Sequence, residues 1–117
     1  MKEDASLQNH FKKGISTLVA LSLLQNQRMY GYELVQTMEK VSGGRFILQE
    51  GTLYPILYRL VDQGLIESER VMVGKRMSRV YYQITPKGVE YLAKIRQEYE
   101  DITAGVAALL DYRPPEP

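Results

Sequence analysis

A proline near the middle of the chain restricts where the central helix can begin. Pro55 lies in the stretch 51–60, where apolar residues recur at helical spacing. Proline has no backbone N–H and its ring collides with the preceding turn, so it is tolerated only near the start of a helix. The helix must therefore begin near Gly51, and we expect Gly64 to end it. Its apolar face then consists of Leu53, Ile56, Leu57 and Leu60.

Two amphipathic helices are predicted before this central helix. Apolar residues at helical spacing predict the first over residues 7–24, with one broad buried face. The second begins at Tyr30, has Gly31 at its entry and ends at Ser42-Gly43-Gly44. Residues 46–48 fit either a short strand or a loop anchored in the core.

A β-hairpin with a basic tip follows the central helix. Residues 65–73 and 79–84 are rich in β-branched and aromatic residues and partly alternate, as strands do. The loop 74–78 between them carries Lys75 and Arg76.

The last helix combines a start signal with a coiled-coil repeat. Thr85 is a natural N-cap, and Pro86 suits the first helical position. From there, apolar residues recur at alternating spacings of three and four, which is typical of a dimerisation seam. That seam consists of Leu92, Ile95, Tyr99, Ile102, Val106 and Leu109. Residues 86–110 are thus predicted as a dimerisation helix, and 111–117 as a flexible tail.

Composition limits the class of protein. A chain of 117 residues fits one domain and gains stability if it shares a core with a second copy. The absence of cysteine excludes a disulfide scaffold and thiolate metal sites, and it fits a reducing cytosol. The longest apolar run, 18–24, is too short to span a bilayer, and the charged N-terminus has no signal region. We expect a cytoplasmic protein with no membrane partner.

Positive charge is concentrated in one segment although the net charge is only +1. Residues 70–96 contain 7 Lys and Arg against 1 acidic residue, whereas residues 97–117 contain 1 against 5. Such a cluster suits an anionic partner, although a solvated charged surface would also explain it.

The sequence offers no catalytic or metal-binding constellation. His10 is the only histidine and has no cysteine or second histidine to act with. Gly74-Lys75 is followed by Arg76 rather than Ser or Thr, which excludes a phosphate-binding loop. We expect no enzyme activity, no cofactor and no metal.

The order of three helices and a basic hairpin predicts a winged helix-turn-helix over residues 1–85. The fold class is mainly α with a small β-hairpin, followed by the dimerisation helix. The polar face of the central helix has the residue types that contact DNA bases and phosphates, and the hairpin would reach the flanking backbone. These candidates are Thr52, Tyr54, Tyr58 and Arg59 on the helix, and Lys75, Arg76 and Arg79 on the hairpin.

Structural alternatives exist for each candidate. Tyr54 and Tyr58 could pack with their rings inside and their hydroxyls outside. Arg59 could pair with Asp62 on the same helix. Lys75 and Arg76 could simply make the hairpin tip soluble.

The ordered set of motifs resembles the PadR family of transcriptional regulators, in its compact branch with a single C-terminal helix. The resemblance covers roughly residues 7–110, and its motifs are Met29-Tyr30-Gly31-Tyr32-Glu33-Leu34, Gly51 to Leu60, Gly64-Leu65-Ile66 and Arg79 to Gly88. It implies a homodimeric repressor that binds a palindromic operator of double-stranded DNA, one winged helix per half-site. It also implies that Tyr32 either approaches the DNA backbone or packs against the recognition helix.

The resemblance further implies a site for a small aromatic ligand in the dimer groove. Tyr99 matches the position where one branch of the family has a tryptophan, although the seam pattern favours a plain seam residue there. This leaves an alternative function, a sensor of a small molecule or protein partner that uses the dimer groove and binds DNA weakly.

Overall fold

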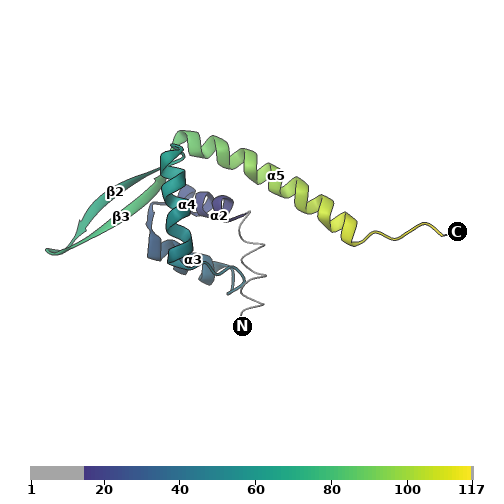
Figure 1. Cartoon of the computed structure of the whole chain (residues 1–117), viewed down its shortest axis with the longest axis horizontal. Helices are drawn as coiled ribbons and strands as arrows, with labels where there is room; N and C mark the ends of the chain where they lie inside the picture. Colours follow the sequence, from purple (N-terminus) through teal and green to yellow (C-terminus); the bar gives the residue numbers. More distant parts are fainter. Residues whose placement is uncertain (1–14, 117) are drawn as a thin grey trace.

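The computed structural model describes residues 15–116 and comprises a helical body with two projections (Figure 1). The hairpin of β2 (Ile66–Val73) and β3 (Met77–Ile84) extends from one side of the body, and the long helix α5 (Pro86–Leu110) leaves from the other. The molecule is accordingly elongated, with principal extents of 75 × 37 × 22 Å. The elements are α2 (Ser16–Asn26), β1 (Met29–Tyr30), α3 (Gly31–Val41), α4 (Glu50–Asp62), β2 (Ile66–Val73), β3 (Met77–Ile84) and α5 (Pro86–Leu110).

The central helix α4 has the predicted position and apolar face. It begins at Glu50, so Pro55 lies in its second turn. The missing N–H of Pro55 deprives the carbonyl of Gly51 of its partner, and Gly51 is exposed, so water can satisfy that carbonyl. Leu53, Leu57 and Leu60 are fully buried, while Ile56 is only partly so. Each buried leucine contributes about 1.5–3 kcal/mol of hydrophobic stabilisation.

The sheet contains one strand more than the sequence predicts. β1 pairs with β3 in antiparallel register, with Met29 opposite Tyr82 and Tyr30 opposite Tyr81. The second helix was expected to start at Tyr30, but Tyr30 belongs to β1 and α3 begins at Gly31. Two residues are too few to show strand alternation, which is why the pattern does not predict β1.

Two loop predictions are resolved by the structure. Residues 46–48 form a loop with Leu48 buried, which confirms the loop alternative. The hairpin turn comprises only residues 74–76, and β3 begins at Met77, so the loop predicted over 74–78 was two residues too long.

Helix α2 covers only part of the first predicted helix. Within the described part of the chain the helix begins at Ser16, and Ala20, Leu21 and Leu24 face the core. Residues 7–14 of the prediction, with His10, lie outside the described residues.

The junction between the winged helix and α5 is built by the Thr85–Gly88 motif. The Thr85 hydroxyl accepts a hydrogen bond from the Gly88 N–H at 3.0 Å, so Thr85 is the predicted N-cap and Pro86 the first helical residue. The same hydroxyl is 2.7 Å from the carbonyl oxygen of Gly64, to which it donates. Gly88 is buried, and a Cβ at this position would overlap the carbonyl oxygen of Leu65. Only glycine therefore permits α5 to lie this close to the α4–β2 turn.

We predict that Gly88→Ala lowers the free energy of unfolding by about 3 kcal/mol, because the methyl group meets backbone rather than a movable side chain. Urea unfolding of the full chain at fixed protein concentration would measure this change. Gly105→Ala is the matched control on the same helix. No atom lies within 4 Å of a Cβ there, so we expect a gain of up to about 1 kcal/mol. Equal effects of the two substitutions would contradict the close-packing argument.

Candidate nucleic-acid interface

Tyr54 packs between two of the sequence motifs, the stretch 51–60 to which it belongs and the stretch 29–34 that contains Gly31. It is half-buried against the core, and a Cβ at Gly31 would lie 2.6 Å from its hydroxyl oxygen. Its hydroxyl donates to Glu50 Oε1 at 3.2 Å. Burial, the hydrogen bond to Glu50 and the nearby negative charge together raise the pKa of Tyr54. The structure thus favours the packing alternative for this ring, which seats α4 on the start of α3.

Tyr58 lies one turn later and is exposed. Its side chain is 61% accessible, and its ring stacks on that of Tyr54 with centroids 6.1 Å apart. Among the described residues its hydroxyl has no hydrogen-bond partner. On the outer surface of α4, Tyr58 therefore has a ring that is stacked on Tyr54 and a hydroxyl that is available for a hydrogen bond.

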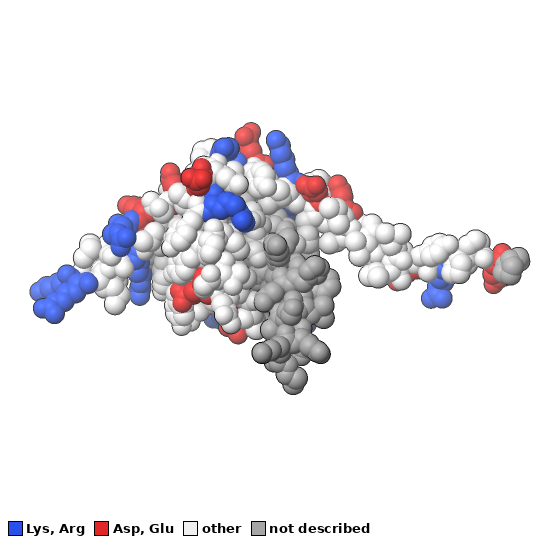
Figure 2. Space-filling model, in the orientation of Figure 1, with Lys and Arg blue, Asp and Glu red and all other residues white. Residues whose placement is uncertain are grey.

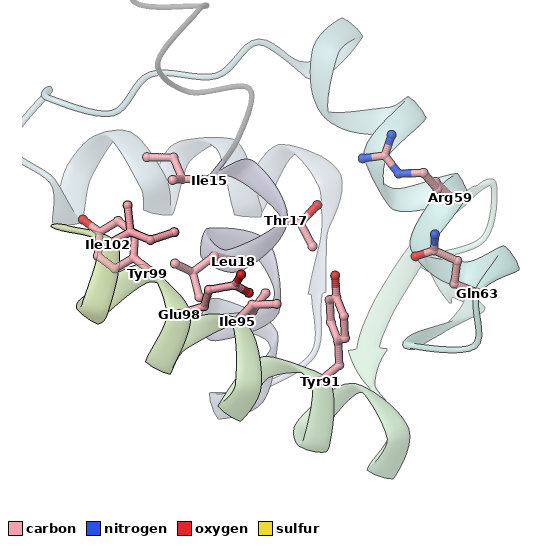
Figure 3. A pocket seen from close by; sticks show the side chains of 10 residues that line it. All are labelled: Ile15, Thr17, Leu18, Arg59, Gln63, Tyr91, Ile95, Glu98, Tyr99 and Ile102. Carbon is pink, nitrogen blue, oxygen red and sulfur yellow. The ribbon is translucent and has the colours of Figure 1, made fainter. Parts of the chain in front are cut away.

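Arg59 lies on a different flank of α4, because neighbouring residues are about 100° apart around a helix. No ion pair joins it to Asp62. Instead Arg59 lines a cavity of about 440 Å³ between α2, α4 and α5 (Figure 3). The structure therefore separates Tyr58 and Arg59, which the sequence placed on one face.

The cavity has a polar and an apolar part. In Figure 3, the polar ends of Thr17, Arg59, Gln63 and Tyr91 lie toward the α4 side, whereas apolar side chains lie farther along α5. Tyr99, the predicted ligand residue, lines that apolar part beside Ile95 and Ile102. Glu98 adds a carboxylate to the lining.

The cations of the hairpin also have different surroundings from one another. Lys75 and Arg76 are exposed in the turn, and Figure 2 shows positive charge gathered at the far end of the hairpin. Arg79 is only partly exposed, with its guanidinium 4.4 Å from the centroid of the Tyr30 ring. Such cation–π contacts contribute about 0.5–1 kcal/mol at exposed sites, so Arg79 has a structural role that the tip residues lack.

The two remaining candidates are exposed on the helices. Tyr32 on α3 is 49% accessible, and its hydroxyl accepts a hydrogen bond from Gln36 Nε2 at 2.9 Å. It therefore does not pack as a buried residue. Thr52 is exposed in the first turn of α4.

One cation near the candidate interface, Arg70, was not identified as a candidate from the sequence pattern. Arg70 on β2 lines a groove between α4 and the hairpin, together with Tyr58 and Asp62. Strand alternation alone could not assign Arg70 to this face, because β2 is exposed along most of its length on both faces. The side of the sheet on which Arg70 lies follows only from its pairing with Val80.

Two features are absent from residues 15–116. No group of three His, Cys, Asp or Glu side chains is arranged to hold a metal ion there. None of the helices in this range combines the length and the apolar character that crossing a bilayer requires.

Comparison with known proteins confirms the resemblance. The model of the PadR-like transcriptional regulator family matches residues 20–94. The transcriptional regulator YqjI of Escherichia coli is 30% identical over 101 residues, which cover 86% of this chain but only 47% of YqjI. This chain thus spans about half the length of that relative.

Solved structures show the same fold. A PadR-family regulator from Eggerthella lenta superposes with a TM-score of 0.83 at 28% identity, covering 96% of both chains. Bacillus subtilis PadR in complex with operator DNA superposes with a TM-score of 0.64 at 20% identity, covering 88% of this chain and 51% of that one. The family consists of transcriptional regulators, so the protein is not an enzyme. With well over half of its length matched, the chain belongs to the PadR-like family of transcriptional regulators.

Proposed function

We propose that the protein is a dimeric, DNA-binding repressor that acts in the cytoplasm on a palindromic operator. The observation that carries this proposal is the basic hairpin tip projecting beside the exposed side of α4 (Figures 1 and 2). Further support comes from the shared fold with Bacillus subtilis PadR, which was solved with operator DNA.

The contacts would divide between the helices and the β2–β3 hairpin, which is the wing. Tyr58 and Thr52 would meet the DNA from α4, Tyr32 would approach the backbone from α3, and Lys75 and Arg76 would bind flanking phosphates. Tyr54 would act through the support it gives to the Tyr58 ring. Arg79 would act indirectly, by bracing the wing against Tyr30. Arg59 would reach the duplex from the edge of α4 next to the cavity.

The dimer would form through α5, a helix about 38 Å long by its 25 residues. Leu92 is buried against the body and Ile95 is partly buried, so the start of the seam holds α5 in place. Farther along, the seam residues are exposed, Ile102 by 58% and Leu109 by 75%. We infer that a second copy covers this part, so that residues 1–85 bind DNA and residues 86–110 dimerise. Two-fold symmetry would then match two half-sites about one helical turn of DNA apart.

Ligand control through the cavity is the finer part of the proposal. The cavity touches α4 at Arg59 and the dimerisation helix at Tyr99. A small aromatic ligand against Tyr99 would therefore change the contacts of both elements and release the operator. The same cavity favours the alternative function, in which the protein senses a small molecule or a partner and binds DNA weakly.

The first test is fluorescence anisotropy with DNA from upstream of the protein's own gene, compared with a scrambled duplex over a salt series. We expect sequence-dependent binding that weakens steeply with salt. Lys75→Glu with Arg76→Glu should weaken binding to both duplexes and lower the salt slope by about 2, since each lost phosphate contact removes roughly 0.9.

The matched control is Lys94→Glu with Arg113→Glu. Both residues are exposed, on α5 and in the tail, and the change in net charge is the same. An equal loss in this control would contradict a wing contact. Equal or negligible binding of the unmodified protein to both duplexes would favour the sensor function.

Tyr58→Phe and Tyr54→Phe make the same chemical change one turn apart. We expect Tyr58→Phe to weaken operator binding about fivefold, because a hydrogen bond from an available hydroxyl contributes about 1 kcal/mol. Tyr54→Phe should leave affinity within twofold, because its hydroxyl bonds to Glu50 within the protein. The same assay measures both variants, and the reverse order would contradict the assignment.

Val106→Asp should convert the dimer to a monomer, because it introduces a charge on the exposed seam. Sedimentation velocity over a concentration series would measure the change. Ala104→Asp is the control on the opposite side of α5 and should remain dimeric. If both variants sediment like the unmodified protein, the seam is not the dimer interface.

A further inference from the structure

The groove between α4 and the hairpin contains Arg70, a cation that the DNA contacts proposed above do not include. It has a volume of about 490 Å³, and its lining includes Tyr58 and Asp62 from α4 and Arg70 and Ser68 from β2. Tyr82 and Val80 of β3 also line it. The groove therefore lies between the two elements that a winged helix places against DNA.

The strand register fixes the side on which Arg70 lies. Arg70 is paired with Val80, and Ser68 is paired with the buried Tyr82. Because residues two apart in a strand share a face, Arg70 lies on the side that faces α4. Arg79 and Tyr81 lie on the opposite side.

Arg70 forms no ion pair with the described residues. Its Nη1 donates to Ser78 Oγ at 3.0 Å, across the hairpin. The ion pairs found among residues 15–116 are Arg28 with Glu69 and Arg96 with Glu100. A neutral hydroxyl orients the guanidinium while leaving its other N–H groups to bind an anion.

The comparison with Arg28 shows what a structural arginine looks like in this sheet. Arg28 is 3.4 Å from Glu69 Oε2 and lies over the Tyr81 ring, 4.7 Å from its centroid. Both its charge and its flat face are thus used within the protein, on the side of the sheet away from α4.

The geometry points to Arg70 as a phosphate-binding residue, with one DNA backbone phosphate held in the groove between Arg70 and the Tyr58 hydroxyl. This inference rests on the proposed DNA binding and adds a contact between the helix and the wing. Asp62 lines the same groove, so its carboxylate repels the phosphate and limits the affinity.

Arg70→Ala tests the assignment in the anisotropy assay with the full chain. We expect affinity to fall about tenfold and the salt slope to fall by about 0.9, for cognate and scrambled duplexes alike. Arg70→Lys should retain the salt slope because it keeps the charge. Arg28→Ala, which removes a cation from the opposite side, should stay within twofold of the unmodified protein.

Asp62→Asn tests the same assignment through an expected gain in DNA affinity, opposite to the loss expected for Arg70→Ala. We expect it to tighten binding to both duplexes, because it removes a negative charge from the groove. Weaker binding of this variant would mean that a DNA amino group occupies the groove, and it would overturn the phosphate assignment.

The outcomes separate this inference from the proposed function. If the unmodified protein binds its operator and Arg70→Ala binds equally well, the inference fails and the proposed function stands. A loss confined to the cognate duplex would indicate a base contact and would also overturn the phosphate assignment. If the unmodified protein does not bind DNA, both fail.

Discussion

The architecture depends on a junction where the end of α4, the hairpin and the start of α5 meet. Thr85 donates to the carbonyl of Gly64 and caps α5, while Lys87 donates to the carbonyl of Gln63 at 2.9 Å. The Gly88 backbone packs directly on Leu65. These contacts satisfy two carbonyls of the turn that follows α4 and one N–H of the first turn of α5 together. The orientation of α5 is thereby tied to that of α4, the helix proposed to read DNA.

This junction gives the two flanks of α4 different surroundings. On one flank, Tyr58 faces the groove beside the hairpin, where Arg70 also lies. On the other flank, Arg59 faces the cavity that α5 closes from below. If Tyr58 meets DNA as proposed, α4 would carry a DNA contact on one flank and cavity residues on the other, so a change in the cavity could reach the wing side through it. That arrangement suits a regulator in which one rigid helix belongs to two sites.

Much of the fold could be predicted because local chemistry controls it. Pro55 and the leucine spacing located α4, and Thr85 with Pro86 located the start of α5. The strand β1 could not be predicted, because two residues pair with β3 only once the tertiary structure brings them together. For the same reason, the surroundings of the candidate site residues could not be predicted. Only the tertiary structure shows that Arg59 lines the cavity and Arg70 lines the groove.

The sequence by itself determined the helices, the hairpin, the basic tip and the seam of α5, since spacing and caps act over a few residues. The sequence also shows where the glycines are, but it does not show which segment packs against each of them. Only the tertiary structure decided that Gly31 receives the Tyr54 ring and that Gly88 receives the Leu65 carbonyl. The physical reason is that a close approach depends on two segments distant in sequence, whereas a helix cap depends on neighbours. The same distinction explains why Tyr54 packs on α3 whereas Tyr58, one turn later, is exposed.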